Sequence, residues 1–189
     1  MNILIIDNGT VLIQELKKLV KNHTYEIIKL GNIDLGVVDR FDTIILSGSS
    51  NSPVLGNKDL YKNEIDLIKN SSKPIVGICL GFELIAYVFG AELKRVNRKI
   101  HGIIDISVVR PDEIFLQLPN FSVFESHRWV IKKTPEDFVT LAISKDGIEA
   151  FKHKNRKLYG FQFHPSVFSD ETCGDEIFNN LLSTLKKNY

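Results

Sequence analysis

Residues 74–86 read Pro-Ile-Val-Gly-Ile-Cys-Leu-Gly-Phe-Glu-Leu-Ile-Ala, and this stretch decides the fold. A short apolar run passes through Gly77 and Cys79 to Gly81 and continues directly as a helical pattern. A strand, a sharp turn and a helix in this order form a nucleophile elbow, here with Cys79 in the place of serine. The helix N-terminus is expected to favour a thiolate at Cys79 and to aim the Leu80 N–H at a developing oxyanion. The alternative is a buried structural cysteine flanked by packing glycines.

The sequence before this elbow alternates between strand and helix patterns. Strands are expected at residues 2–6, 25–29 and 43–46, and amphipathic helices at residues 10–21 and 59–69. Alternation of this kind predicts parallel strands with helices on both faces of the sheet.

After the elbow helix, strand-like runs follow one another with few helical intervals. They cover residues 103–109, 121–125, 138–143, 148–153 and 158–163. These runs are expected to form a meander, closed by a helix over residues 174–187. The prediction is a single α/β domain spanning residues 1–189, with a three-layer flavodoxin-like fold and a mixed, mostly parallel central sheet.

Composition narrows the function classes. The 189 residues include 24 basic and 23 acidic ones, so charge gives no reason to expect a nucleic-acid or anionic-membrane partner. No apolar run approaches the roughly 20 residues of a membrane span. Cys79 and Cys173 have no CxxC spacing, which argues against a zinc cluster and favours a reducing, cytoplasmic location. No phosphate-loop motif or metal-ligand cluster is evident, so no metal or organic cofactor is expected.

A thiolate nucleophile needs a base, and the chain has five histidines. His164 is the best placed of them, because it ends the expected strand 158–163 and precedes Pro165, which cannot continue a strand ladder. Ligands of open α/β sheets bind at this carboxyl edge. His127 is a candidate for lining the site, since it stands in a segment where charged, hydroxyl and aromatic residues converge.

Five segments taken together resemble the class I glutamine amidotransferases. They are Ile-Asp-Asn-Gly at 6–9, Ser-Gly at 47–48, Gly-Ile-Cys-Leu-Gly at 77–81, Glu-Ser-His at 125–127 and Tyr-Gly-Phe-Gln-Phe-His-Pro at 159–165. The resemblance spans nearly the whole chain and is strongest to free-standing glutaminase subunits, above all that of archaeal-type GMP synthetase. The Cys and His motifs are specific in combination, whereas the small-residue loop at 47–53 alone is a weak sign of anion binding.

The resemblance implies hydrolysis of glutamine to glutamate and ammonia, and delivery of the ammonia to a synthetase partner of the ATP-pyrophosphatase type. It implies that Cys79 attacks the amide carbon to form a γ-glutamyl thioester, while His164 accepts and returns the proton. The oxyanion is expected between the N–H groups of Ser49 and Leu80. The glutamine is expected to contact Gly48, Glu83, Ser126, His127 and Arg128.

One departure from the family pattern concerns the catalytic triad. The family usually reads His-Pro-Glu, whereas this chain reads His164-Pro165-Ser166 and so has Ser166 in the third catalytic position. Loss of an orienting acid is costly in a triad that depends on it, although a Cys–His pair tolerates it better. Asp170 or Glu171 is a candidate replacement. The alternative is a catalytically weak or silent binding or regulatory protein.

Two further departures concern the pocket. Ser49 stands where a second glycine is common, and it needs backbone angles that serine tolerates. Phe82-Glu83 is similar to the γ-glutamyl hydrolases, which leaves a peptidase of γ-glutamyl bonds as another alternative. A flavodoxin-like domain without chemistry at Cys79 is the remaining one.

Overall fold

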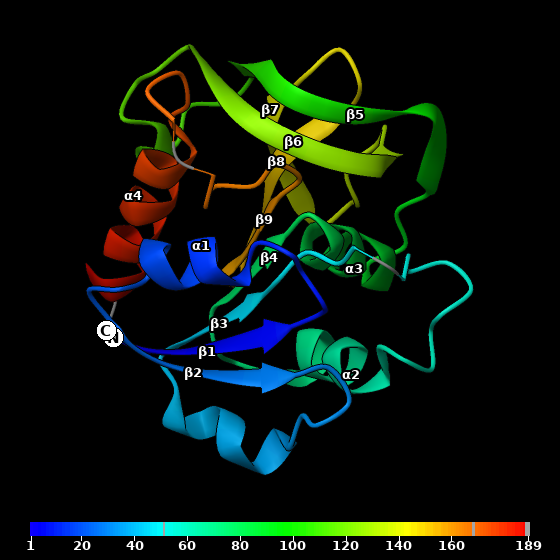
Figure 1. Cartoon of the computed structure of the whole chain (residues 1–189), viewed down its shortest axis with the longest axis vertical. Coiled ribbons are helices and arrows are strands. Elements are labelled where there is room, and N and C mark those ends of the chain that lie inside the picture. The colour runs from blue at the N-terminus through cyan, green and yellow to red at the C-terminus, as the bar shows by residue number, and fades with distance from the viewer. Residues whose placement is uncertain (51, 168, 188–189) are drawn as a thin grey trace.

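The computed structural model describes residues 1–50, 52–167 and 169–187, and its centre is a nine-stranded sheet with helices on both faces (Figure 1). The strands are β1 (Asn2–Asp7), β2 (Thr24–Lys29), β3 (Thr43–Leu46), β4 (Ile75–Ile78), β5 (Leu93–Val108), β6 (Asn120–Ile131), β7 (Phe138–Ile143), β8 (Ile148–His153) and β9 (Leu158–Phe161). The α-helices are α1 (Ile13–Leu19), α2 (Lys62–Asn70), α3 (Leu80–Val88) and α4 (Gly174–Lys187). Two 3₁₀-helices are η1 (Leu35–Arg40) and η2 (Glu113–Phe115).

Five strands are parallel, in the order β2-β1-β3-β4-β9, as the alternating pattern predicts. The carboxyl ends of parallel strands meet at one edge of a sheet. Cys79 follows β4 at this edge, and His164 comes shortly after β9.

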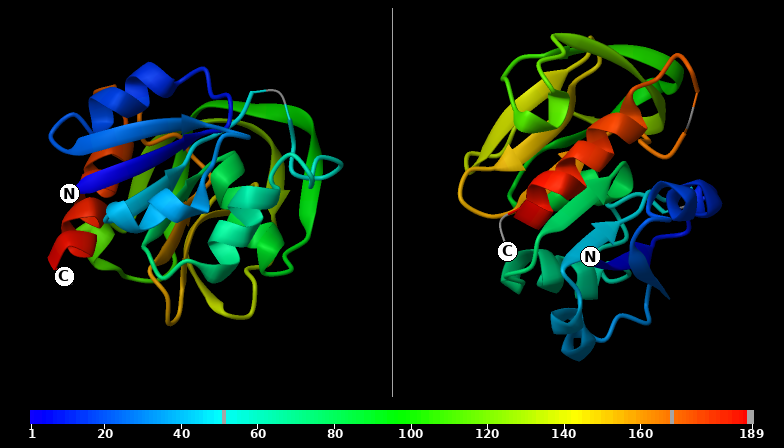
Figure 2. Two further views of the ribbon diagram at one scale, coloured as in Figure 1. Left: turned by 90° about the horizontal axis from the view of Figure 1, so that it is seen from below. Right: turned by 90° about the vertical axis from the view of Figure 1, so that its left-hand side faces the viewer.

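The remaining strands are antiparallel and continue the sheet in the order β9-β8-β7-β5-β6. The expected simple meander is therefore wrong, because β7 pairs with β5 and not with β6. Between β5 and β6 the chain passes through η2, whose Ile114 carbonyl accepts a hydrogen bond from Asn180 of α4. The chain then returns on the outer side of β5. Figures 1 and 2 show the β5–β6 hairpin at the end of the molecule opposite to β2.

The core lies on both faces of the sheet, because successive strand residues point to opposite sides. Ile3 and Ile5 of β1 belong to the cluster that α1 and α4 cover. Leu4 and Ile6 of the same strand belong to the cluster that α2 and α3 cover. The mixed sheet between two helical layers confirms the predicted fold class. None of the helices in the described part of the chain has the length and apolar character needed to cross a membrane.

The strands of the hairpin are longer than the sequence indicates. β5 begins at Leu93 instead of residue 103, and β6 continues to Ile131 instead of residue 125. The first half of β5 is mostly exposed and rich in basic residues, so it lacks the apolar run by which a strand is recognised. The helices α1 and α2 each begin about one turn later than expected.

Candidate active site

Cys79 occupies the sharp turn between β4 and α3. Its backbone has φ 52° and ψ −103°, a conformation that residues with side chains rarely adopt. Two hydrogen bonds hold the turn: the Cys79 N–H donates to the Phe161 carbonyl at 2.8 Å, and the Glu83 N–H donates to the Cys79 carbonyl at 3.0 Å. The strained residue is thus fixed from β9 on one side and from α3 on the other.

Gly77 and Gly81 allow β3, β4 and α3 to pack closely around this turn. A Cβ on Gly77 would lie 2.5 Å from the backbone of Gly81, and a Cβ on Gly81 would overlap the carbonyl group of Leu46. Because neighbouring backbone atoms occupy both positions, neither can hold a side chain without moving the elbow.

His164 is held mainly from β6, although it follows β9 in the chain. Its backbone N–H donates to the Phe124 carbonyl at 2.8 Å, and its ring centroid lies 6.3 Å from that of Phe124. The backbone carbonyl of Ser126 also acts on the His164 ring and raises its pKa. His164 is therefore positioned by main-chain groups of the hairpin.

The side chains of Cys79 and His164 meet beside Gly48. A Cβ on Gly48 would lie 3.4 Å from Cys79 Cβ and 3.3 Å from His164 Cε1. Both side chains line a cavity of about 610 Å³, which is bordered by the loops after β1 and β3, by α3 and by the β5–β6 hairpin. A thiol and an imidazole thus share one cavity at the carboxyl edge of the parallel strands.

The thiol and the imidazole are both uncharged in the resting protein. Burial raises the pKa of Cys79 well above its usual value, and the nearby Glu83 carboxyl adds to this, whereas the Leu80 N–H and Lys99 act in the opposite direction. Burial lowers the pKa of His164 to about 4. Loss of solvent thus opposes the expected thiolate and outweighs the N–H group at the helix N-terminus.

The loop after β3 is held by Asn8. The Asn8 N–H donates to Ser47 Oγ at 2.9 Å, and the Asn8 amide group donates to the Ser47 carbonyl at 3.0 Å. Neither Gly48 nor Ser49 has a positive φ, so the serine at position 49 fits without backbone strain. Asn51, which belongs to the expected small-residue loop, lies outside the described residues.

No carboxylate bonds the His164 ring within the ranges that the structure describes. Ser166 is buried, but no hydrogen bond joins its side chain to His164 among these residues. Asp170 and Glu171 are both exposed and do not fold back onto the ring. The expected replacement of the missing acid by one of these two residues therefore does not occur.

Glu83 contributes a buried carboxyl group to the cavity. Its side chain is 3% exposed and accepts a hydrogen bond from the Gln162 amide at 3.4 Å. Burial raises the pKa of Glu83 to about 8. The group therefore carries a proton at neutral pH and offers one donor and one acceptor.

The β6 residues that were expected to contact glutamine lie on two sides of the strand. Ser126 Oγ lies 3.2 Å from His101 Nδ1, and the exposed Arg128 donates to the Asn97 carbonyl at 3.3 Å. Both residues line the cavity. His127 also borders it, but its side chain is only 1% exposed and both ring nitrogens are bonded elsewhere. The His127 imidazole is therefore not free to bind a substrate.

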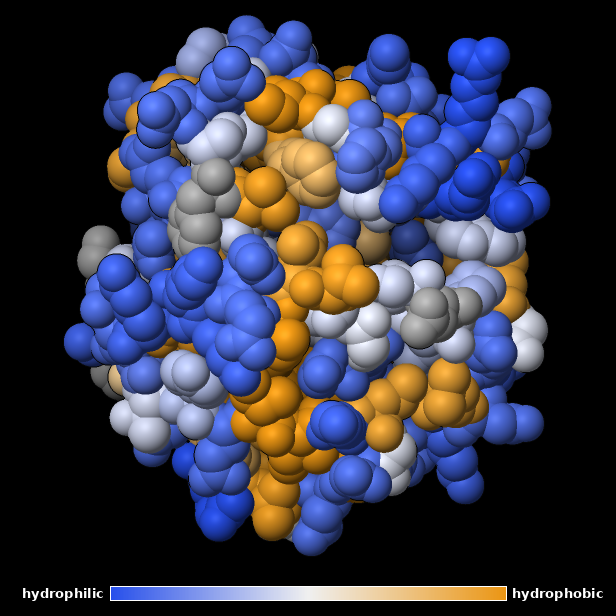
Figure 3. Space-filling model, viewed as in Figure 1, coloured by the Kyte–Doolittle hydropathy of each residue, from blue (hydrophilic) through white to orange (hydrophobic). Residues whose placement is uncertain are grey.

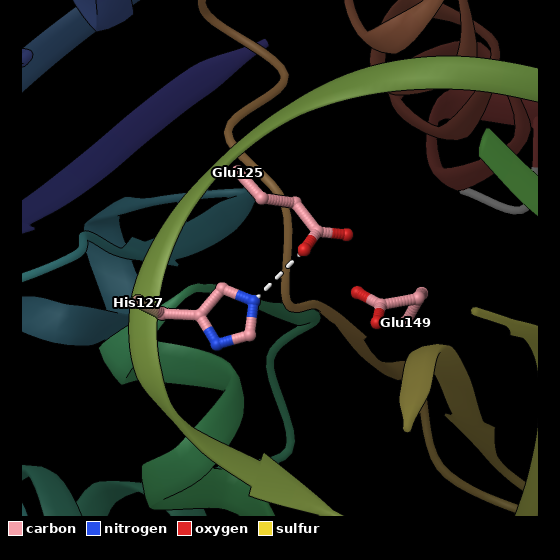
Figure 4. Close-up of side chains that lie close together, drawn as sticks. All are labelled: Glu125, His127 and Glu149. Carbon is pink, nitrogen blue, oxygen red and sulfur yellow. Dashed lines mark hydrogen bonds and ion pairs between the residues drawn. The ribbon is translucent and has the colours of Figure 1, made fainter. Parts of the chain in front are cut away.

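Glu125, His127 and Glu149 form a buried cluster that sequence inspection did not find (Figure 4). One oxygen or nitrogen atom from each residue lies within 4.8 Å of the others. His127 Nε2 is 3.0 Å from Glu125 Oε2, and the Glu149 carboxyl faces Glu125, with Glu125 Oε1 and Glu149 Oε2 lacking any other partner among the described residues. Two carboxylates and an imidazole are a donor set that divalent metals accept.

The β5 residues on the cavity wall were missed by sequence reasoning. Arg95, Lys99 and His101 line the cavity together with Thr10 from the loop after β1. The sequence does contain one signal for these residues, the run of basic residues at 94–99. Glu92 is the only acidic residue close to this run in the sequence. Figure 3 shows hydrophilic side chains gathered over the part of the surface where β5 begins.

Comparison with known proteins identifies the family. The model of the family Glutamine amidotransferase class-I matches residues 4–184. A glutamine-hydrolysing GMP synthase subunit from Archaeoglobus fulgidus is 35% identical over 148 residues, which cover 77% of each chain. The corresponding subunit from Methanocaldococcus jannaschii is 39% identical over 139 residues, covering 72% of this chain and 70% of that one.

Solved structures give the same result. A GMP synthase subunit protein from Thermoplasma acidophilum superposes with a TM-score of 0.88 at 28% identity, covering 100% of this chain and 95% of that one. A glutamine amidotransferase from Thermotoga maritima, with a TM-score of 0.76 at 19% identity, covers 100% and 83% and shares the fold. The chain belongs to the class-I glutamine amidotransferase family.

Proposed function

We propose that this amidotransferase hydrolyses glutamine through a Cys79 thioester and supplies the ammonia to the ATP-pyrophosphatase subunit of a GMP synthetase. The observation that carries the proposal is the meeting of a strained cysteine and a buried histidine beside Gly48, in one cavity. The relatives that are glutamine-hydrolysing subunits of GMP synthase favour this partner.

The reaction starts from an uncharged pair. As the Cys79 sulfur attacks the amide carbon, its proton passes to His164 and the carbonyl electron pair moves to oxygen. The N–H groups of Leu80 and Ser49 stabilise this oxyanion. The His164 imidazolium then protonates the departing nitrogen, the C–N bond breaks, and ammonia leaves a γ-glutamyl thioester. Because burial lowers the pKa of His164 to about 4, its imidazolium is a strong proton donor at this step.

Hydrolysis of the thioester reverses these roles. His164 accepts a proton from water while the water oxygen attacks the thioester carbon. The C–S bond then breaks, the proton returns to the Cys79 sulfur, and glutamate leaves.

The residues around the cavity hold the substrate. The protonated Glu83 supplies a donor and an acceptor, as an amide side chain would in its place. Arg128 supplies a cation for the α-carboxylate, while Gly48 and Ser126 supply contacts close to the scissile amide. His127 does not bind the substrate directly, because both of its ring nitrogens are hydrogen-bonded within the protein.

The synthetase partner covers a rim of basic residues around the mouth of the cavity. Arg95 and Lys99 line the mouth of the cavity, and neither makes an ion pair within the described residues. Lys94 and Arg98 extend this basic rim along β5, where both are exposed. An acidic surface on the synthetase complements the rim and closes the mouth, so that ammonia leaves toward the second active site.

The deciding experiment measures ammonia released from glutamine by the purified chain, alone and with candidate ATP-pyrophosphatase subunits. Cys79→Ala is the control, since it removes the nucleophile and leaves a small side chain in the elbow. Ammonia release that depends on Cys79 supports the proposal. No release in any combination refutes it.

The alternative of a silent binding protein is favoured by one observation, the lack of a described carboxylate on His164. Ser166→Glu restores the family's acid. A large gain of activity in this variant over a nearly inactive wild type would support the alternative, and brisk hydrolysis by the wild type would contradict it. Comparing glutamine with γ-glutamyl dipeptides tests the peptidase alternative in the same assay.

A further inference from the structure

The position of β6 decides how His164 is oriented. β6 is the last strand of the sheet and pairs with β5 alone in the strand ladder. It nevertheless supplies the main-chain partner of His164, because the Phe124 carbonyl accepts from the His164 backbone N–H, and the Ser126 carbonyl raises the pKa of the ring. A small shift of this edge strand would therefore turn the imidazole.

The inner face of β6 carries the Glu125–His127–Glu149 cluster. In Figure 4, Glu125 and His127 project from the same side of β6, and Glu149 points toward them from β8. Glu125 and His127 flank Ser126, whose carbonyl raises the pKa of the His164 ring. Glu149 also joins the cluster to β9, because its carbonyl accepts from the Gln162 N–H at 2.9 Å. These contacts form a closed circuit that runs from His164 through β6 and β8 to the residue two positions before His164.

A donor and an acceptor can be assigned to each hydrogen bond of the cluster. His127 Nδ1 lies 2.8 Å from the Trp129 carbonyl, which can only accept, so Nδ1 carries the ring proton. A neutral imidazole then accepts at Nε2 from a protonated Glu125. Glu149 in its protonated form can donate to Glu125, since Glu125 Oε1 and Glu149 Oε2 have no other described partner, and Ser144 Oγ donates to Glu149 at 2.7 Å.

The pKa shifts of the three side chains agree with this assignment of donors and acceptors. Burial raises the pKa of Glu125 to about 7 and that of Glu149 well above its usual value, and it lowers the pKa of His127. The other charged groups that act on the cluster are Asp146, from the loop between β7 and β8, and Lys99 of β5. These directions favour the neutral form of each member, so that the cluster avoids an unpaired buried charge.

We propose that Glu125, His127 and Glu149 are positioning residues that hold β6 against β8 and thereby orient His164, the task of the carboxylate that Ser166 does not provide. This inference rests on the proposed function for its link to turnover. Its structural part applies to any reaction of Cys79 that needs an oriented His164.

The first test compares Glu149→Leu with Glu149→Gln. A glutamine side chain keeps a donor toward Glu125 and an acceptor for Ser144, so Glu149→Gln is expected to retain activity within about 3-fold. Leucine breaks the circuit, and glutaminase kcat is expected to fall about 100-fold while KM stays within about 3-fold. Asp105→Leu is the matched control, because it removes an exposed carboxylate that bonds Ser122 on the same hairpin.

The second measurement does not depend on glutamine. The rate at which iodoacetamide alkylates Cys79 reports how well His164 accepts the thiol proton. It is expected to fall about 10-fold in Glu149→Leu and to stay unchanged in Glu149→Gln and Asp105→Leu. An inactive wild type that still shows this alkylation pattern would refute the proposed function and leave the positioning network supported.

Rescue separates positioning from general stability. Adding Ser166→Glu to Glu149→Leu supplies a carboxylate directly to His164, and it is expected to recover most of the lost kcat and alkylation rate. Circular dichroism checks that each variant is folded; if the double variant is not, the two Glu149 variants decide. Equal kcat and alkylation rates in folded Glu149→Leu and Glu149→Gln would overturn the proposal.

Discussion

Cys79 and His164 face the same empty position, the one that a side chain on Gly48 would fill. The missing Cβ would lie 3.4 Å from Cys79 Cβ and 3.3 Å from His164 Cε1, so a methyl group would touch both side chains and press the imidazole away by a few tenths of an ångström. The glycine has no positive φ, so conformational freedom is not the reason for it. Its role in this site is to leave space.

Gly48→Ala is therefore expected to reduce glutaminase activity by about 10-fold, because a misplacement of reacting groups by 1 Å costs about 100-fold and the methyl group shifts the imidazole by less than that. The melting temperature should change little, since the loop backbone can hold alanine at this φ. Activity and thermal melting of the same sample check the prediction. Gly36→Ala, whose methyl group meets only the Asp34 side chain, is the control. An alanine variant as active as the wild type would contradict this account.

The elbow and the parallel strands could be predicted because their signals are local. Residues 74–86 contain an apolar strand, two glycines and a helical pattern, and this order predicts a strand, a sharp turn and a helix. The packing confirms it, since Cβ atoms on Gly77 and Gly81 would collide with backbone. The order of β7, β5 and β6 could not be predicted, because it depends on contacts of η2 with α4 that are distant in sequence.

The protonation of the site and its supporting residues could not be predicted from the sequence either. A helix N-terminus beside Cys79 suggests a thiolate, but the sequence does not reveal how completely the sulfur is buried. Glu149 lies 24 residues after Glu125 in a different strand, so nothing in the local sequence joins them. Such clusters follow from tertiary packing alone.

The pH dependence of catalysis should reflect the lowered pKa of His164. Because this pKa is about 4, the imidazole stays neutral and able to accept the thiol proton as the pH falls from 7 to 5. The acid limb of the kcat/KM profile for glutamine is therefore expected near pH 4. Circular dichroism at each pH excludes unfolding as the cause. An acid limb centred near pH 6.5, the usual value for histidine, would show that His164 is not buried as described.

Buried carboxyl groups should make the protein less stable at alkaline pH. Glu64 is fully buried in α2, and burial raises its pKa from 4.5 to about 8. A raised folded-state pKa means that the folded protein binds the proton more tightly, so stability is lost as the pH rises from about 4.5 through 8 and levels off above that. The histidines with lowered pKa values have the opposite effect, an increase in stability with rising pH, but only below about pH 6.5. Between pH 6.5 and 8.5, Glu64 alone is expected to reduce the free energy of unfolding by about 2 kcal/mol.

Glu64→Gln tests this contribution, because the amide has the same shape and no titration. Urea unfolding at pH 6.5 and pH 8.5 should show a smaller loss of stability in the variant than in the wild type. Glu176→Gln, at the start of α4, is the control for removal of an exposed carboxylate. Equal losses in wild type and Glu64→Gln would show that Glu64 ionises without cost in the folded protein.

Charge on the first half of β5 should control association with the synthetase. Lys94 and Arg98 are exposed beside the cavity mouth but do not line it. Reversing both charges, in the double variant Lys94→Glu and Arg98→Glu, is expected to weaken binding to the ATP-pyrophosphatase partner about 10-fold or more at low salt. The difference should shrink as the salt concentration rises, because ions screen exposed charges. Basal ammonia release without the partner should stay unchanged.

Titration calorimetry at two salt concentrations measures the effect, and Lys69→Glu on α2 controls for a reversed charge away from the mouth. Unchanged affinity in the double variant would mean that the synthetase docks on another face.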